Sequence, residues 1–325
     1  MNRRRKLIVA LGAGALAAPL SSFAQQQTKV WRVGVLVPGS ASAWAPMVEA
    51  LRAGLLDLGY VDGKNINIEY RSAEDQYDQL PKLANDLVRL KVDVIVSNAT
   101  SGVGAARRAT TSIPIVMGAI GDPVASGFVT NLSRPGANIT GLTFFGKEIA
   151  VKRLELLKEA SPGLTHVAFL KDRTIPSDYI TAMDRAALAM KMVLEPVNLD
   201  SPDKLESAIA ELAKRHVGGI VAMETPLLIS IGKRMGAAAL KHRIAAIGFK
   251  EVAQGGGLIA YGPNIVDMWR RAATYVDKIL NGAKPGDLPI EQASRFELVV
   301  NKSTATALGI KIPDSILLRA DKAIE

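Results

Sequence analysis

Four small residues, Ser97, Asn98, Ala99 and Thr100, follow a β-branched apolar run at residues 92–96 and could bind an anion. The run predicts a strand buried on both faces of a parallel sheet, and a helix is expected to begin at the small residues. The first N–H groups of a helix lack partners within the helix and carry partial positive charge, so a carboxylate can bind there. Capping of the helix by the same hydroxyl and amide side chains is the alternative interpretation.

Other predicted strands also end in loops whose residues could bind a ligand. The candidates in the first half of the chain are Ser40, Trp44, Ala119, Gly121 and Asp122, and those in the second half are Tyr179, Glu224, Thr225, Phe249 and Glu251. Because ligands of open α/β sheets bind beyond the carboxyl ends of the strands, we expect these loops to border one cleft. Hydroxyls and backbone amides would bind a carboxylate, an acid would bind an ammonium group, and an aromatic ring would cover an apolar moiety. Core packing of the aromatic rings and solvent exposure of the acids are the alternatives.

Residues typical of catalysis or cofactor binding are scarce. None of the three histidines, His166, His216 and His242, has a partner at metal-ligand spacing. The chain has no G-x-x-x-x-G-K-[ST] loop, no G-x-S-x-G motif and no H-E-x-x-H motif. Gly102 and Gly104 match part of a dinucleotide-binding fingerprint, but Arg107 occupies the third glycine position. We therefore expect no metal, no cofactor and no enzymatic activity.

Composition limits the remaining function classes. The 325 residues contain no cysteine, which excludes disulfides and thiolate metal sites, and the net charge is +9. The lysines and arginines are dispersed without interleaved aromatic residues, so we expect no nucleic-acid partner. A basic run at residues 2–6, an apolar stretch at 7–20, and small residues at Ser22 and Ala24 are typical of a secretory signal peptide. We expect residues 1–24 to be this signal peptide and the mature protein to be soluble and periplasmic.

Strand-like and helix-like segments alternate in two successive series. The predicted strands lie at residues 31–37, 65–70, 92–96 and 113–117, and again at 166–170, 193–197, 218–223 and 244–249. Such alternation predicts parallel βαβ units with right-handed crossovers. We therefore expect an α/β fold of two similar doubly wound lobes.

Eight motifs of the chain resemble one known family. They lie at residues 32–36, 58–66, 90–96, 121–124, 133–141, 152–158, 256–262 and 275–285. Together they resemble the periplasmic substrate-binding proteins of ABC transporters with the type I fold. Within that group the chain is similar to the family related to tryptophan- and tyrosine-binding proteins.

The resemblance implies a three-segment hinge and a ligand enclosed between the lobes. The implied first lobe comprises residues 31–143 and 262–286, and the second comprises 144–261 and 287–325. Crossovers are expected near residues 138–145, 258–263 and 285–290. In related amino-acid binders the loops that match Ser97–Thr100 and Ala119–Gly121 hold the ligand carboxylate, and the position near Glu251 is a candidate for the ammonium group.

We therefore expect a monomeric solute receptor that binds a small molecule, such as an aromatic or other amino acid, and delivers it to an ABC transporter permease. An enzyme using the same cleft is one alternative, but it would need a nucleophile–base pair, and the cleft loops contain no histidine. A ligand-sensing regulatory module is the other. It would need a DNA-binding segment before Trp31, where the signal peptide is expected.

Overall fold

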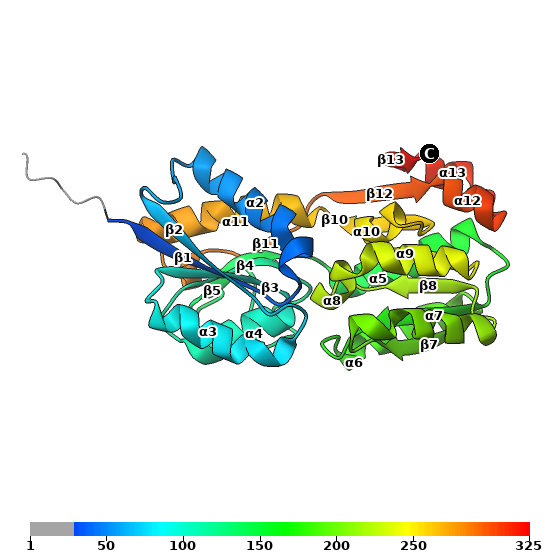
Figure 1. The fold of residues 1–325 in the computed structure, drawn as a ribbon, viewed down its shortest axis with the longest axis horizontal. Coiled ribbons are helices and arrows are strands. Elements are labelled where there is room, and N and C mark those ends of the chain that lie inside the picture. Colours follow the sequence, from blue (N-terminus) through cyan, green and yellow to red (C-terminus); the bar gives the residue numbers. More distant parts are fainter. Residues whose placement is uncertain (1–28) are drawn as a thin grey trace, which may run out of the picture. The chain divides into compact units, whose positions relative to one another are not determined.

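Two sheets, each built mainly from parallel strands, make up residues 29–325, the part of the chain that the computed structural model describes (Figure 1). Trp31–Glu325 forms one compact unit. The predicted signal peptide at residues 1–24 lies outside the described residues.

The first sheet has six strands in the order β11-β5-β4-β3-β1-β2, and all of its pairings are parallel. The strands are β1 (Trp31–Val37), β2 (Ile66–Ser72), β3 (Val94–Asn98), β4 (Ile115–Ile120), β5 (Ile139–Thr143) and β11 (Glu291–Gln292). The accompanying helices are α2 (Ala41–Asp57), η1 (Tyr77–Gln79), α3 (Leu80–Arg89), α4 (Ala99–Ala109), α11 (Ile265–Leu280) and η3 (Pro285–Asp287). We call this sheet with these helices the first lobe.

The second sheet has seven strands in the order β13-β12-β10-β9-β8-β6-β7, and only the β10–β12 pairing is antiparallel. The strands are β6 (His166–Lys171), β7 (Val193–Asn198), β8 (Gly219–Ala222), β9 (Ala245–Gly248), β10 (Ile259–Pro263), β12 (Phe296–Asn301) and β13 (Lys322–Ile324). The accompanying helices are α5 (Gly146–Ala160), α6 (Ser177–Ala189), η2 (Pro202–Lys204), α7 (Leu205–Lys214), α8 (Pro226–Ser230), α9 (Gly232–Lys241), α10 (Lys250–Gln254), α12 (Lys302–Leu308) and α13 (Asp314–Leu317). We call this group the second lobe.

Side chains that point alternately to the two faces of a strand allow helices to pack on both faces of the first sheet. In β1, Val33 and Val35 belong to the same apolar core as Leu51 of α2, whereas Leu36 belongs to another core with Leu87 of α3. Successive side chains of a strand point to opposite faces, so one strand contributes to both cores. Every residue of β3 is buried, as a strand covered on both faces requires. The predicted α/β fold of two doubly wound lobes is confirmed.

The chain passes between the two sheets three times, after β5, after β10 and after β11. Glu291 pairs with Leu142 of β5, so the third passage follows Gln292 instead of lying at residues 285–290. A strand of two residues is too short to produce a periodic sequence pattern. The first passage leads into α5, whose N-terminus borders the space between the sheets.

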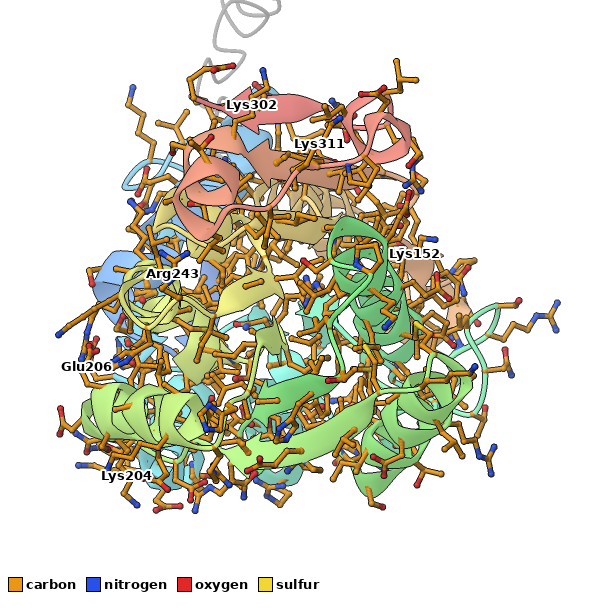
Figure 2. All side chains as sticks on the ribbon, turned by 90° about the vertical axis from the view of Figure 1, so that its right-hand side faces the viewer. Lys152, Lys204, Glu206, Arg243, Lys302 and Lys311 are labelled. Atoms are coloured by element: carbon orange, nitrogen blue, oxygen red, sulfur yellow. The ribbon has the colours of Figure 1, made fainter. Side chains whose placement is uncertain are left out.

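Several charged side chains of the second lobe point outward and lie far apart on its surface. Figure 2 shows Lys152, Lys204, Arg243 and Lys302 on different sides of this lobe. Among the helices of residues 29–325, none has the length and apolar character needed to cross a membrane.

Candidate functional site

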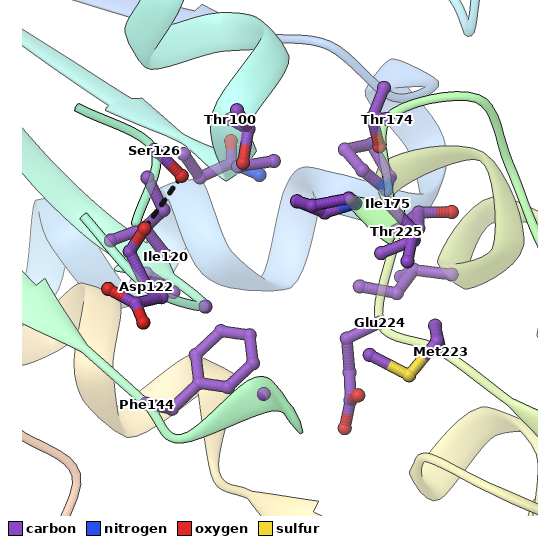
Figure 3. A pocket seen from close by; sticks show the side chains of 18 of the residues that line it. Thr100, Ile120, Asp122, Ser126, Phe144, Thr174, Ile175, Met223, Glu224 and Thr225 are labelled. Carbon is purple, nitrogen blue, oxygen red and sulfur yellow. Dashed lines mark hydrogen bonds between the residues drawn. The ribbon is translucent and has the colours of Figure 1, made fainter. Parts of the chain in front are cut away.

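A cavity lies between the carboxyl ends of the two sheets, bordered by side chains from both lobes (Figure 3). It encloses about 690 Å³ of space not filled by protein atoms, including its open mouth. Ten of the residues predicted from the sequence line it: Trp44, Asn98, Ala99, Thr100, Ala119, Gly121, Asp122, Tyr179, Glu224 and Thr225. Loops from both halves of the chain therefore border one cavity through these ten residues, as expected.

Four predicted residues lie elsewhere. Ser97 is completely buried, and its hydroxyl donates to the carbonyl oxygen of Leu36 at 2.8 Å, so it joins two strands. Ser40 donates from its hydroxyl to the Oγ atom of Ser230 in the second lobe at 3.2 Å. Phe249 and Glu251 line a neighbouring cavity between α2, α9 and α10. Burial raises the pKa of the Glu251 carboxyl.

The junction of β3 and α4 presents unpaired polar groups to the cavity. The strand pairing with β4 shifts register between Ser97 and Asn98, and Ala99 takes a left-handed backbone conformation with φ +54°. Asn98 precedes the helix, but its side chain makes no capping hydrogen bond, and its buried Oδ1 atom has no partner. Strained backbone and unpaired buried polar atoms are both costly and are concentrated at functional sites. The first turn of α4 and the Asn98 amide can therefore interact with a polar ligand.

Trp44 contributes a second unpaired polar atom to the same cavity. Its side chain is buried, its Nε1 donor has no partner, and its ring centroid lies 5.9 Å from that of Trp269. A Cβ atom at Gly39 would come within 2.2 Å of Nε1, so only glycine at this position allows the indole to lie where it does. The cavity thus offers an unpaired donor at Trp44 and an unpaired acceptor at Asn98.

On the opposite wall, Glu224 is paired with a buried arginine that the sequence patterns above do not single out. Arg153 of α5 has no solvent exposure and donates from Nη1 to Oε2 of Glu224 at 2.8 Å. The same guanidinium donates to the carbonyl oxygens of Ala222 and Tyr261, each at 2.7 Å. These bonds orient the Glu224 carboxylate and compensate its charge without contact with water. A charged residue on the apolar face of α5, four residues after Ile149, is the signal that could reveal it.

The loop after β4 is held by its own hydrogen bonds. Oδ1 of Asp122 accepts from the backbone N–H groups of Val124 at 3.0 Å and Ala125 at 2.9 Å. Ser126 donates from its hydroxyl to the Asp122 carbonyl oxygen at 2.6 Å, the bond drawn in Figure 3. Asp122 therefore lines the cavity on a preorganised loop.

Apolar side chains from both lobes face each other across the cavity. In Figure 3, Phe144 and Ile120 lie on one side, and Ile175 and Met223 lie on the other. Tyr179 also lines the cavity, and its hydroxyl lies against Gly146, where an added Cβ atom would come within 2.7 Å of it. Burial raises the pKa of Tyr179, so its hydroxyl stays protonated at neutral pH. The described cavity wall contains two acids, Asp122 and Glu224, but no lysine, arginine or histidine.

The comparison with protein families shows which family the chain belongs to. Residues 32–324 match the family of ABC transporter substrate-binding proteins. The chain belongs to this family. As the solute-binding protein of an ABC transporter, it binds a small solute and delivers it to the transporter's permease. Its fold is the type I periplasmic binding protein fold, as predicted.

Three similar proteins illustrate the range of relatives of this solute-binding protein. A tyrosine-binding protein of Clostridioides difficile is 27% identical over 277 residues, which cover 82% of this chain and 78% of the relative. The crystal structure of a conserved domain protein from Vibrio cholerae is 28% identical, with a TM-score of 0.85 over 91% of this chain and 100% of that one. An ABC domain from Streptococcus pneumonia, solved with L-Trp, is 24% identical, with a TM-score of 0.83 over 90% of this chain and 99% of that one.

Proposed function

We propose that this solute-binding protein captures a zwitterionic amino acid with an aromatic or other large apolar side chain. The observation that carries the proposal is the cavity wall itself, where Trp44 and Asn98 offer unpaired polar atoms and two acids lie, Asp122 and the Arg153-paired Glu224. Unpaired buried polar groups cost free energy unless a ligand satisfies them. The 27% identical relative that is a tyrosine-binding protein supports the same ligand class.

Each part of such a ligand has a complementary region of the cavity. The carboxylate would accept from the first N–H groups of α4, from the Nδ2 group of the Asn98 amide and from the Thr100 hydroxyl, since a helix N-terminus favours an anion. The unpaired Oδ1 atom of Asn98 would accept from a donor of the ligand such as its ammonium group. The ammonium group would be bound by Glu224 or Asp122. The side chain would lie between the apolar walls and under the rings of Phe144 and Tyr179. Micromolar affinity corresponds to about 8 kcal/mol, which several charge-assisted hydrogen bonds and one buried ring can supply.

The remaining expectations from the sequence belong to the same proposal. The receptor is exported by the signal peptide at residues 1–24 and works in the periplasm as a monomer, without a nucleic-acid partner. The receptor does not modify the solute chemically. Membership of a family of transporter substrate-binding proteins supports this point.

A thermal-shift panel tests the ligand class. Residues 25–325 would be mixed with each of the twenty L-amino acids, and the midpoint of unfolding would be measured at a fixed ligand excess. Binding to the native state alone raises the midpoint. We expect aromatic amino acids to raise the midpoint of the wild type most. The same amino acids should raise the midpoint of the Asn98→Ala variant less. The substitution Asn131→Ala, in an exposed loop of the same lobe, is the matched control. A panel in which only charged solutes or none raise the midpoint would contradict the ligand class.

A further inference from the structure

A loop of the first lobe hydrogen-bonds to segments of the second lobe that lie next to the cavity lining. Residues 73–79 follow β2, and we call them the latch loop. Glu74 and Asp75 have φ angles of +49° and +63°, so two successive residues other than glycine take the left-handed conformation. Such backbone costs free energy and persists where other contacts hold it. Within its own lobe the loop is held by the Asp75 N–H, which donates to the Pro38 carbonyl oxygen at 3.1 Å, and by the Glu74 carboxylate, which accepts from the Ala41 N–H at 3.0 Å. Further contacts lie in the other lobe.

Tyr77 bonds to two separate segments of the second lobe. Its hydroxyl donates to Oδ2 of Asp172 at 2.8 Å and accepts from the N–H group of Leu227 at 3.0 Å. These partners lie next to two of the second-lobe segments that line the cavity, Thr174–Pro176 and Met223–Pro226. Tyr77 itself does not line the cavity. Asp172 also accepts from the hydroxyl of Thr174 at 2.6 Å, so one carboxylate connects the latch loop to the cavity wall.

Asp75 makes the second connection of the latch loop. Its Oδ1 atom accepts from the hydroxyl of Ser230, at the end of α8, at 3.0 Å. The Ser230 oxygen in turn accepts from the backbone N–H of Ser40 at 3.2 Å. An ion pair between Arg173 and Asp78 lies at the exposed rim of the same contact, where water weakens it. The contact is therefore carried by partly buried hydrogen bonds.

The sheet order places this contact far from the crossovers. The chain leaves the first lobe after β5 and β11, at one edge of the first sheet, whereas the latch loop follows β2 at the opposite edge. A rotation about the crossovers moves the β2 edge furthest. Opening of the lobes must therefore break the bonds of Tyr77 and Asp75 to the second lobe.

We propose that Asp75 and Tyr77 form an interlobe latch that holds the lobes closed and thereby sets the rate at which the solute leaves. Both are positioning residues, since neither contacts the cavity. The proposal rests on the proposed function only in that a solute is needed to measure its release. Loss of the Tyr77 hydroxyl leaves the Leu227 N–H and the Asp172 carboxylate short of a partner in the closed state alone. The closed state loses stability and the dissociation rate rises.

The test compares Tyr77→Phe with Tyr60→Phe. Both substitutions remove a tyrosine–aspartate hydrogen bond, but that of Tyr60 joins it to Asp277 at 2.9 Å within the first lobe. Stopped-flow dissociation of the amino acid that the panel selects should be about tenfold faster for Tyr77→Phe, which corresponds to one such bond. The association rate should change little. Tyr60→Phe should leave dissociation within twofold of the wild type. Dissociation from Tyr77→Phe within the same twofold limit would overturn the proposal.

A second readout needs no solute. Because the sequence has no cysteine, Lys82→Cys on α3 and Leu188→Cys on α6, both exposed, give two unique labelling sites in different lobes. Pulsed electron resonance should show a larger share of long distances for Tyr77→Phe than for Tyr60→Phe or the unsubstituted pair. Identical distance distributions would overturn the latch even if no amino acid binds. Where Tyr77→Phe fails to fold, Ser230→Ala tests the Asp75 connection by the same two measurements.

Discussion

The Nη1 atom of Arg153 lies 2.8 Å from Oε2 of Glu224, and neither side chain has more than 3% of its surface exposed. This pair places a carboxylate on the cavity wall and its countercharge behind that wall. The arrangement gives Glu224 two functions that experiment can separate. One is to satisfy Arg153, and the other is to face the solute.

Removal of Arg153 alone should lower the unfolding free energy far more than removal of both Arg153 and Glu224. Arg153→Met leaves a buried carboxylate without its countercharge, which costs about 3–5 kcal/mol of unfolding free energy. The double variant Arg153→Met with Glu224→Met should recover most of that loss but should not recover solute binding. Urea unfolding followed by circular dichroism measures the first effect, and calorimetric titration measures the second. Equal stability of the single and double variants would contradict this account.

The contact between Gly146 and Tyr179 predicts a compensating pair of substitutions. Gly146→Ala adds a Cβ atom that would lie within 2.7 Å of the Tyr179 hydroxyl, so the ring must move and solute affinity should fall about tenfold. Tyr179→Phe removes the clashing oxygen, and the double variant should bind more tightly than Gly146→Ala alone. Gly163→Ala, whose added methyl group would meet no atom within 4 Å, is the control. Additive losses in the double variant would refute the contact.

Solute affinity should rise as the pH falls from 7 to 5. Burial in the closed arrangement raises the pKa of Asp75 to about 6, the Ser230 hydrogen bond opposes the rise, and the nearby Glu74 and Asp172 carboxylates add to it. In the open arrangement we expect the ordinary value of about 3.9. An acid whose pKa is higher in the closed state favours closure when protonated, so this stabilisation is complete below about pH 4 and is lost as the pH rises through 6.

The variant Asp75→Asn should abolish most of this pH dependence. It keeps an oxygen acceptor for Ser230 but carries no charge, so its affinity at pH 7 should exceed that of the wild type about fivefold, or roughly 1 kcal/mol after allowance for partial solvent contact. Titrations at pH 5, 6, 7 and 8 measure the effect, since a zwitterionic amino acid does not itself titrate in this range. Glu251→Gln is the comparison, because burial also raises the pKa of Glu251. A wild-type affinity that falls as the pH is lowered would contradict the predicted effect of Asp75 protonation.

Two neighbouring residues of the β3–α4 junction should separate stability from binding. Ser97→Ala loses a buried hydrogen bond to the Leu36 carbonyl, so the unfolding free energy should fall by about 1 kcal/mol with little change in affinity. Asn98→Ala removes an amide whose buried Oδ1 atom has no partner in the protein, so affinity should fall about tenfold with little change in stability. Denaturant unfolding and calorimetry on the same two proteins decide the matter. The opposite assignment of the two effects would show that the wrong side chain faces the solute.

The sequence patterns predict the sheets and the loops but not which loop residues face the cavity. Ser97 and Asn98 are adjacent polar residues, and the alternation of a strand sends only one of them into the cavity. The register shift between them decides which one, and no local pattern reveals a bulge of this kind. Phe249 and Glu251 follow β9 as expected but border the neighbouring cavity, because that position depends on how the lobes pack.

Contacts between the lobes cannot be predicted from the sequence for the same reason. Tyr77 and Asp172 are 95 residues apart, and their bond depends on the relative orientation of two separately wound sheets. Arg153 is the exception, since a charge on the apolar face of α5 is visible in the sequence and signals a buried partner. Local patterns thus determine the elements, whereas the site depends on their assembly.

Titration of the wild type and Asn98→Ala with L-tyrosine, tyramine and 3-(4-hydroxyphenyl)propionate tests the central claim most directly. The two analogues lack the carboxylate and the ammonium group respectively, so each leaves part of the cavity wall unpaired. We expect L-tyrosine to bind the wild type at least tenfold more tightly than either analogue, and Asn98→Ala to lose most of the preference over tyramine. Equal binding of all three compounds, or an unchanged preference in Asn98→Ala, would contradict the recognition of a zwitterionic amino acid at the β3–α4 junction.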